Sequence, residues 1–134
     1  MQFTEHEMTV GVDAVARELF LARKLPWRRT KGEAAWHDLP PFTKYQHRSA
    51  AGEMILPTLT ALPERPSPGA RPDFSLDELT TAAEEGARAL ADHRAAGSWE
   101  ATSAKRRSRL IRVTAMLTQH ALDAMPPRPA DDGA

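Results

Sequence analysis

Hydrophobic residues along this chain recur at spacings of three and four and do not alternate with polar ones. No window of strand length shows the alternation of apolar and polar positions that is typical of a β-strand. The pattern therefore predicts an all-α fold. We expect four main helices, arranged as two antiparallel hairpins that form one small bundle.

The first helix is predicted from an apolar stripe near the N-terminus. Its members, spaced by three or four residues, are Met8, Val12, Val15, Leu19 and Ala22. Thr4 and Glu7 have the spacing of a capping box, whereas Gly11 favours a later start, so the first residue of this helix stays open. Pro26 predicts its end near Leu25.

A loop is predicted to follow, over residues 26–38. This segment contains proline, glycine and a run of basic residues, and its apolar residues lack helical spacing. Asp38 is the expected N-cap of the second helix. Pro40 and Pro41 then fall in its first turn, where a residue without a backbone N–H costs little.

The second helix is expected to reach about Leu62 and so to complete the first hairpin, which covers about residues 4–62. Pro57 lies inside its apolar pattern and predicts a kink or a break, because proline removes one backbone hydrogen bond. Residues 63–73 contain four prolines and a glycine, and we expect them to form a linker that stays outside the core.

The second hairpin is expected over about residues 75–125. Its first helix has the clearest start in the chain, a capping box of Ser75 and Glu78, and Gly97 is the expected stop. The apolar face of that helix is formed by Leu76, Leu79, Ala83, Gly86 and Leu90.

The last helix is predicted to start at Ser98 or Thr102 and to end before Pro126. Its apolar seam is formed by Leu110, Thr114, Leu117, Ala121 and Met125. Residues 1–125 should therefore form a single helical domain, and residues 126–134 a disordered tail.

Composition excludes several classes of function. The 134 residues are enough for one domain, and 18 basic residues balance 18 acidic ones, so the total charge implies no polyanionic partner. The chain has no cysteine, which excludes disulfides and thiol chemistry. No segment is apolar enough to span a membrane and the N-terminus does not resemble a signal peptide, so we expect a cytoplasmic protein. Arginine outnumbers lysine 14 to 4, a usage typical of GC-rich bacterial or phage genes.

The sequence contains no motif of catalytic or metal-binding residues. No two of the 5 histidines are spaced by three or four residues on a predicted helix, so we expect no metal site. Asp77 and Glu84 lie opposite the apolar seam of the third helix and are expected to form a solvated face. No phosphate-binding glycine loop or nucleophile motif is present. We therefore expect a protein that is not an enzyme and that uses no cofactor.

A basic run at the start of the last predicted helix is the strongest local feature. Lys105, Arg109 and Arg112 share one face, opposite the apolar seam, and Arg106 lies beside them. Cations near a helix N-terminus oppose the helix dipole and repel one another, so a compensating contact is expected. Two explanations are open. The cations pair with acidic residues of the third helix or of the C-terminal tail, or are simply solvated. Alternatively, they contact phosphate or an acidic protein.

A second basic group lies between two tryptophans. Arg28 and Arg29 follow Trp27 and precede Trp36, a mixture of cations and aromatic rings that is found in nucleotide and single-strand binding sites. The same composition is also that of an ordinary loop held in place by its tryptophans. These four residues join the basic run as candidate binding residues.

Four short stretches between Val12 and Leu62 carry a resemblance to a known family. They are Ala16 to Leu19, Trp27 within basic residues, Trp36 to Pro40, and Leu59 to Leu62. In this order they resemble the ryanodine-receptor-type repeat of bacterial and phage proteins, although the Gly-Trp-x-x-Gly loop of that family is missing. The resemblance implies a non-catalytic helical recognition module that senses a ligand or a partner.

Together these features predict a small non-enzymatic binding or regulatory protein that acts through protein–protein contact, of the kind carried by phages and other mobile elements. The alternative is a nucleic-acid-binding regulator that uses the basic face of the last helix. The core is thin in large apolar side chains. We therefore also expect a homodimer, or a protein partner, that covers Leu or Met residues of the second and fourth predicted helices.

Overall fold

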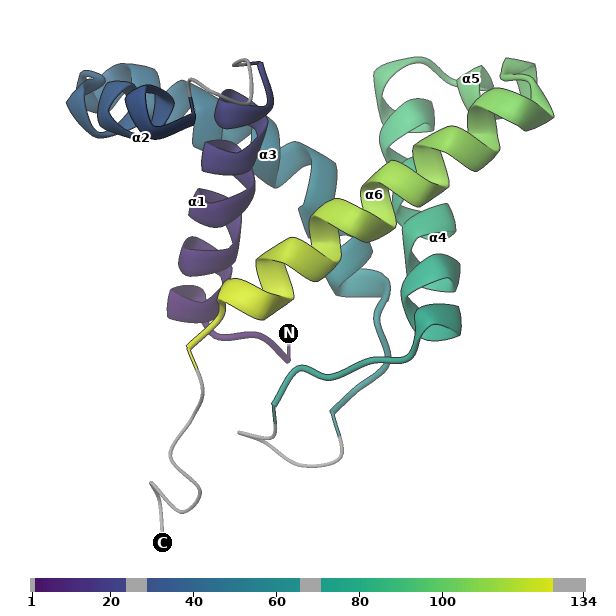
Figure 1. Ribbon diagram of the computed structural model, residues 1–134. Coiled ribbons are helices and arrows are strands. Elements are labelled where there is room, and N and C mark those ends of the chain that lie inside the picture. The colour runs from purple at the N-terminus through teal and green to yellow at the C-terminus, as the bar shows by residue number, and fades with distance from the viewer. Residues whose placement is uncertain (1, 24–28, 66–70, 127–134) are drawn as a thin grey trace, which may run out of the picture.

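The computed structural model describes residues 2–23, 29–65 and 71–126. Of these residues, 81% are helical and none lies in a strand, which confirms the prediction of an all-α protein. The described residues form six helices, two more than the four main helices expected (Figure 1). The predicted tail falls outside the described residues except for its first position.

Helix α1 (Glu5–Ala22) starts at the capping box formed by Thr4 and Glu7. The Glu7 N–H donates to Thr4 Oγ1 at 3.0 Å, and the Thr4 N–H donates to Glu7 Oε1 at 2.9 Å. The later start favoured by Gly11 is therefore wrong. Gly11 instead lets α1 approach the last helix, because a Cβ at this position would lie only 3.2 Å from the Cβ of Ala121.

Helix α2 (Arg29–Asp38) occupies most of the segment that was expected to form a loop, so that prediction is wrong for these residues. Trp36 anchors the helix. It is buried, and its ring lies 5.6 Å from the ring of Phe20 and 5.8 Å from that of His47. A helix held by one large apolar side chain has no apolar period, which explains why the sequence pattern did not reveal it.

Helix α3 (Pro41–Ala61) follows directly. Its N-cap is Pro40, whereas Asp38, the expected cap, is the last residue of α2. Pro41 is in the first turn, as predicted. Pro57 lies inside the helix and does not end it, so the predicted break is absent. Thr58 and Leu59, which follow this proline directly, are fully buried, so the helix continues into the core.

Helix α4 (Leu76–Arg94) starts at the predicted capping box, in which Ser75 and Glu78 exchange hydrogen bonds of 2.8 and 3.1 Å. It ends shortly before Gly97, which was expected to stop it. Gly97 has a positive φ of 77° and is the N-cap of the short helix α5 (Ser98–Ala101). A glycine suits this position, because other residues rarely adopt a positive φ.

Helix α6 (Ala104–Ala124) is the long diagonal helix of Figure 1 and packs across α1, α3 and α4. Ser103 caps it, and the Ser103 Oγ accepts a hydrogen bond of 3.2 Å from the Arg106 N–H. The expected caps, Ser98 and Thr102, are both wrong. Ser98 starts α5, and Thr102 ends it, because this short helix comes between α4 and α6.

The core lies where α1, α3, α4 and α6 cross. Its larger members are Val15, Ile55, Leu59, Leu79 and Leu117. Two residues expected on apolar seams are exposed instead, Leu76 to 76% and Leu110 to 38%. Both precede the first buried residue of their helix, which is Leu79 in α4 and Thr114 in α6.

Helices α3 and α4 pack backbone to backbone at Gly86. A Cβ added to Gly86 would lie 2.8 Å from the backbone nitrogen of Thr58 and 2.9 Å from its Cα, so a larger residue does not fit. Thr58 is fully buried, and its Oγ1 has no hydrogen-bond partner among the described residues. This contact fixes how closely the two helices approach each other.

Arg65 lies in the proline-rich segment that was expected to stay outside the core, yet it is buried, so the expectation is wrong at this residue. Its guanidinium forms a bidentate ion pair with Glu7, with N···O distances of 3.0 and 3.1 Å. It also lies over the ring of Phe3, 4.9 Å from the centroid. The Arg65 N–H donates to Gln2 Oε1 at 2.9 Å. We call this contact between the N-terminus and the linker the Glu7–Arg65 clamp.

Candidate functional site

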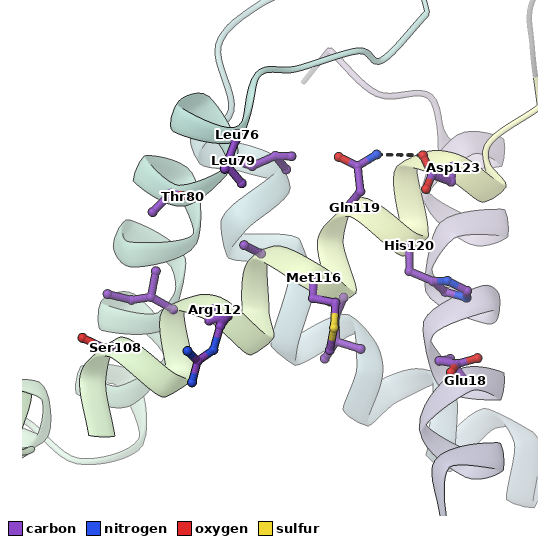
Figure 2. A pocket seen from close by; sticks show the side chains of 13 residues that line it. Glu18, Leu76, Leu79, Thr80, Ser108, Arg112, Met116, Gln119, His120 and Asp123 are labelled. Atoms are coloured by element: carbon purple, nitrogen blue, oxygen red, sulfur yellow. Dashed lines mark hydrogen bonds between the residues drawn. The ribbon is translucent and has the colours of Figure 1, made fainter. Parts of the chain in front are cut away.

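A concave surface of about 860 Å³ follows the outward face of α6 (Figure 2). It is bordered by α4 on one side and by α1 on the other, and we call it the α6 groove. Its lining includes Glu18 of α1, Leu76 of α4, and Arg112, Met116, His120 and Asp123 of α6.

Met116 is the apolar centre of the α6 groove. Its side chain is 63% exposed, although methionine is normally buried. Arg112 and His120 lie one turn before and one turn after it, and Figure 2 shows all three pointing to the same side of α6. Leu76, which is also exposed, borders the groove from α4. An exposed apolar centre in a concave surface is typical of an interaction site.

The two ends of the α6 groove carry opposite charges. Arg112 lines one end, and Arg109 is exposed one turn earlier on α6. Glu18 and Asp123 line the other end, where the Asp123 Oδ1 accepts a hydrogen bond of 2.7 Å from Gln119 Nε2 (Figure 2). The groove is therefore positive at the early turns of α6 and negative at the late turns.

The basic run predicted at the start of α6 is exposed, as the sequence suggested. Its candidate binding residues are Lys105, Arg106, Arg109 and Arg112. In the part of the chain that the structure describes, no carboxylate lies within ion-pair distance of any of the four. Pairing with the acidic residues of α4 is therefore absent there. The acidic C-terminal tail lies outside the described residues.

Arg107 belongs to the same run but has a different role. Its guanidinium donates hydrogen bonds to the backbone carbonyls of Trp99 at 3.0 Å and Glu100 at 2.8 Å. It also lies near the Trp99 ring, 5.7 Å from the centroid. This arginine therefore fastens α5 to α6, and the exposed cations around it are left for solvent or a partner.

Of the second group of candidate binding residues, only the side chain of Trp36 is among the described residues. Trp27 and Arg28 lie outside the described residues, as does the side chain of Arg29, the first residue of α2. Trp36 is only 4% exposed, so its ring packs in the core and offers no stacking surface. In Figure 1, α2 and the start of α6 lie at opposite sides of the molecule.

A smaller polar pocket of about 320 Å³ lies beside Trp36 and contains three cations. All three are already engaged, and Arg17 pairs with Asp13 at 3.7 Å. Arg48 pairs with Asp13 at 2.7 Å, and Lys44 Nζ donates to the carbonyl of His37 at 2.8 Å. Their charges are therefore used inside the protein, and we do not assign a ligand to this pocket.

Phe42 and Tyr45, near the start of α3, form a second exposed apolar pair. Their rings stack with centroids 6.4 Å apart, and the two residues are 69% and 64% exposed. The pair does not line the α6 groove. It provides a matched control for substitutions at Met116.

Among the described residues, no three His, Asp or Glu side chains come together in a group that could hold a metal ion. No described helix has the length and apolar character needed to cross a membrane. No protein-family model, no curated protein and no solved structure matches this chain.

Met116 is a functional candidate that the sequence pattern did not single out, because it predicted only that a partner covers Leu or Met residues of the second and fourth predicted helices. It is not a member of the apolar seam of α6, and it follows Arg112 by four residues, so helical spacing places it on the exposed basic face. An apolar residue on the polar face of an amphipathic helix was the available indication. Its neighbours from α1 and α4 became visible only in the tertiary structure.

Proposed function

We propose that this chain is a small non-enzymatic binding protein that docks an α-helix of another protein chain in the α6 groove. The observation that carries the proposal is the exposed Met116 in a concave surface with Arg112 at one end and Asp123 at the other. Amphipathic helices dock in such grooves through apolar anchors, while charges at the rim set their direction. A docked helix would place its acidic end beside Arg112.

The packing of α6 supports this use of the groove. Helix α6 contacts both α1 and α4 and presents its remaining face outward. In the proposal, α1 and α3 form one hairpin of the bundle, and α4 and α6 form the other. The contacts of α6 with α1 and α3 hold the two hairpins together. A surface built on packed helices holds its side chains in place, which favours specific binding over transient contact.

The residue usage and the resemblance of residues 12–62 to a recognition repeat extend the proposal. They support a regulatory role in the cytoplasm, of the kind found among phage and mobile-element proteins. In such a role the protein acts by occupying a partner, and catalysis is not required.

Site-specific photo-crosslinking in the native host tests the proposal. A benzophenone amino acid replaces Met116 in one variant and Tyr45 in a control variant. We expect the first to form a crosslink to a defined protein, mapped by mass spectrometry, that the control does not form. Crosslinks at Met116 that are no more frequent or specific than those at Tyr45 would overturn the proposal.

A second candidate function is nucleic-acid binding, and the exposed basic residues of α6 favour it. Four cations without a described ionic partner can neutralise phosphates and release their counterions. The test is gel retardation of single- and double-stranded DNA and RNA at low ionic strength. Absence of retardation in all of these experiments would exclude this function.

A further inference from the structure

We infer that the α6 groove takes a second copy of this chain, with the two α6 helices antiparallel about a two-fold axis at Met116. The inference rests on the proposed function, because it names the occupant of the same groove. A two-fold interface uses one surface twice, so that surface must be complementary to itself. The α6 face meets this condition through the order of its charges.

The positions around Met116 are arranged symmetrically in sequence. Arg109 comes seven residues before Met116 and Asp123 comes seven residues after it. Arg112 and His120 are placed four residues before and four residues after. On a helix of 3.6 residues per turn, all four side chains lie within about 40° of the direction of Met116. They therefore form one narrow stripe with Met116 at its centre.

An antiparallel pair of α6 helices brings one pair of opposite charges together at each end of this stripe. When Met116 faces Met116 of the second copy, Arg109 of each copy faces Asp123 of the other. Arg112 then faces the imidazole of His120, which carries no opposite charge. The end of the groove that carries Asp123 then lies against Arg109 of the second copy. A parallel arrangement would instead place arginine against arginine, which is repulsive.

The same arrangement covers the exposed apolar residues of the groove. Met116 of each copy packs against its counterpart, and Leu76, 76% exposed in the single chain, borders the covered area. The two α6 helices overlap from residue 108 to residue 124, a length of about 25 Å at 1.5 Å per residue. The pairing thus removes apolar surface from water along most of the helix.

Sedimentation of the full chain over a range of concentrations tests the inference. We expect a dimer that dissociates on dilution. Met116→Asp should raise the dissociation constant at least tenfold, because it places two carboxylates at the centre of the interface. Phe42→Asp, which changes an equally exposed apolar residue outside the groove, should leave the constant unchanged. Circular dichroism checks that both variants keep their helix content.

Charge reversal tests the register. Arg109→Asp and Asp123→Arg should each weaken the dimer, whereas the double variant should regain most of the wild-type affinity, because the facing charges are again opposite. A chain that is monomeric at every concentration, a dimer insensitive to Met116→Asp, or a double variant no better than the singles would overturn the inference. The crosslinking experiment separates this failure from failure of the proposed function. A crosslink from position 116 to a different protein would support docking without self-association.

Discussion

The arginines of this protein fall into two contrasting environments, the Glu7–Arg65 clamp and the outward face of α6. The side chains of Arg65 and Glu7 are 4% and 3% exposed, and the guanidinium makes two hydrogen bonds to the carboxylate. Arg109 and Arg112, by contrast, are exposed and have no carboxylate within ion-pair distance among the described residues. Arginine therefore stabilises the fold in the first region and is available to bind a partner in the second.

The difference follows from what surrounds each side chain. Removing a charge from water costs several kcal/mol, which a buried arginine must recover from a close partner with good geometry. Arg65 meets this requirement, so it can tie the linker to the N-terminus. An exposed cation keeps its water and needs no partner, so it contributes little to folding and stays free to bind. Burial, and not residue type, therefore separates structural charges from binding charges.

The largest expected effect comes from breaking the clamp. Glu7→Gln leaves the guanidinium of Arg65 buried without its counter-charge, and we expect a loss of about 3–5 kcal/mol in the free energy of unfolding. Denaturant unfolding measures it. The control is Asp13→Asn, which breaks the exposed Arg48–Asp13 pair and should cost less than about 1 kcal/mol. Equal losses in the two variants would show that the Glu7–Arg65 clamp contributes no more to stability than an exposed ion pair.

Two buried glycines differ in the room that each leaves for a side chain. Gly86→Ala forces a Cβ against the backbone of Thr58, and we expect it to lower stability by about 1–3 kcal/mol. Gly52→Ala should raise stability by about 0.5–1 kcal/mol, because its Cβ finds ordinary contacts and alanine favours the helix. Thermal unfolding followed by circular dichroism reports both signs. A stabilised Gly86→Ala variant would contradict the close packing of α3 and α4.

The smallest effect is expected on the outward face of α6. Changing Lys105, Arg109 and Arg112 together to alanine should leave the free energy of unfolding unchanged or raise it by a few tenths of a kcal/mol per site, because it removes cations that oppose the helix dipole. The free energy of unfolding is best compared at low salt between two chains that both carry Met116→Asp, because self-association then does not contribute to it. A loss above about 1 kcal/mol would show that these cations are structural.

The same triple change sharpens the alternative of nucleic-acid binding. If the wild-type chain retards DNA or RNA, each of the three cations neutralises about one phosphate. The slope of log affinity against log salt should then flatten by roughly three units. An unchanged slope would place the phosphate contacts on other residues.

The sequence by itself determined those features that depend on neighbouring residues. The all-α class follows from apolar spacing, and the starts of α1 and α4 follow from capping boxes in which each cap bonds a residue three positions away. The exposure of Lys105, Arg109 and Arg112 follows from their place opposite the apolar seam. In each case the determining interaction spans at most a few turns, so the sequence pattern contains it.

Only the tertiary structure decided the features that depend on distant segments. Helix α2 is held by Trp36 against residues of α1 and α3, and Arg65 is buried by a partner 58 positions earlier in the chain. The α6 groove joins Glu18 to Leu76 and Met116. Contacts between such distant residues leave no periodic pattern in the sequence, because the identity of one residue does not predict the position of its partner. The apolar contacts gain their energy from removing side chains from water, and the buried ion pair needs a partner of good geometry, so both form only when the helices pack together.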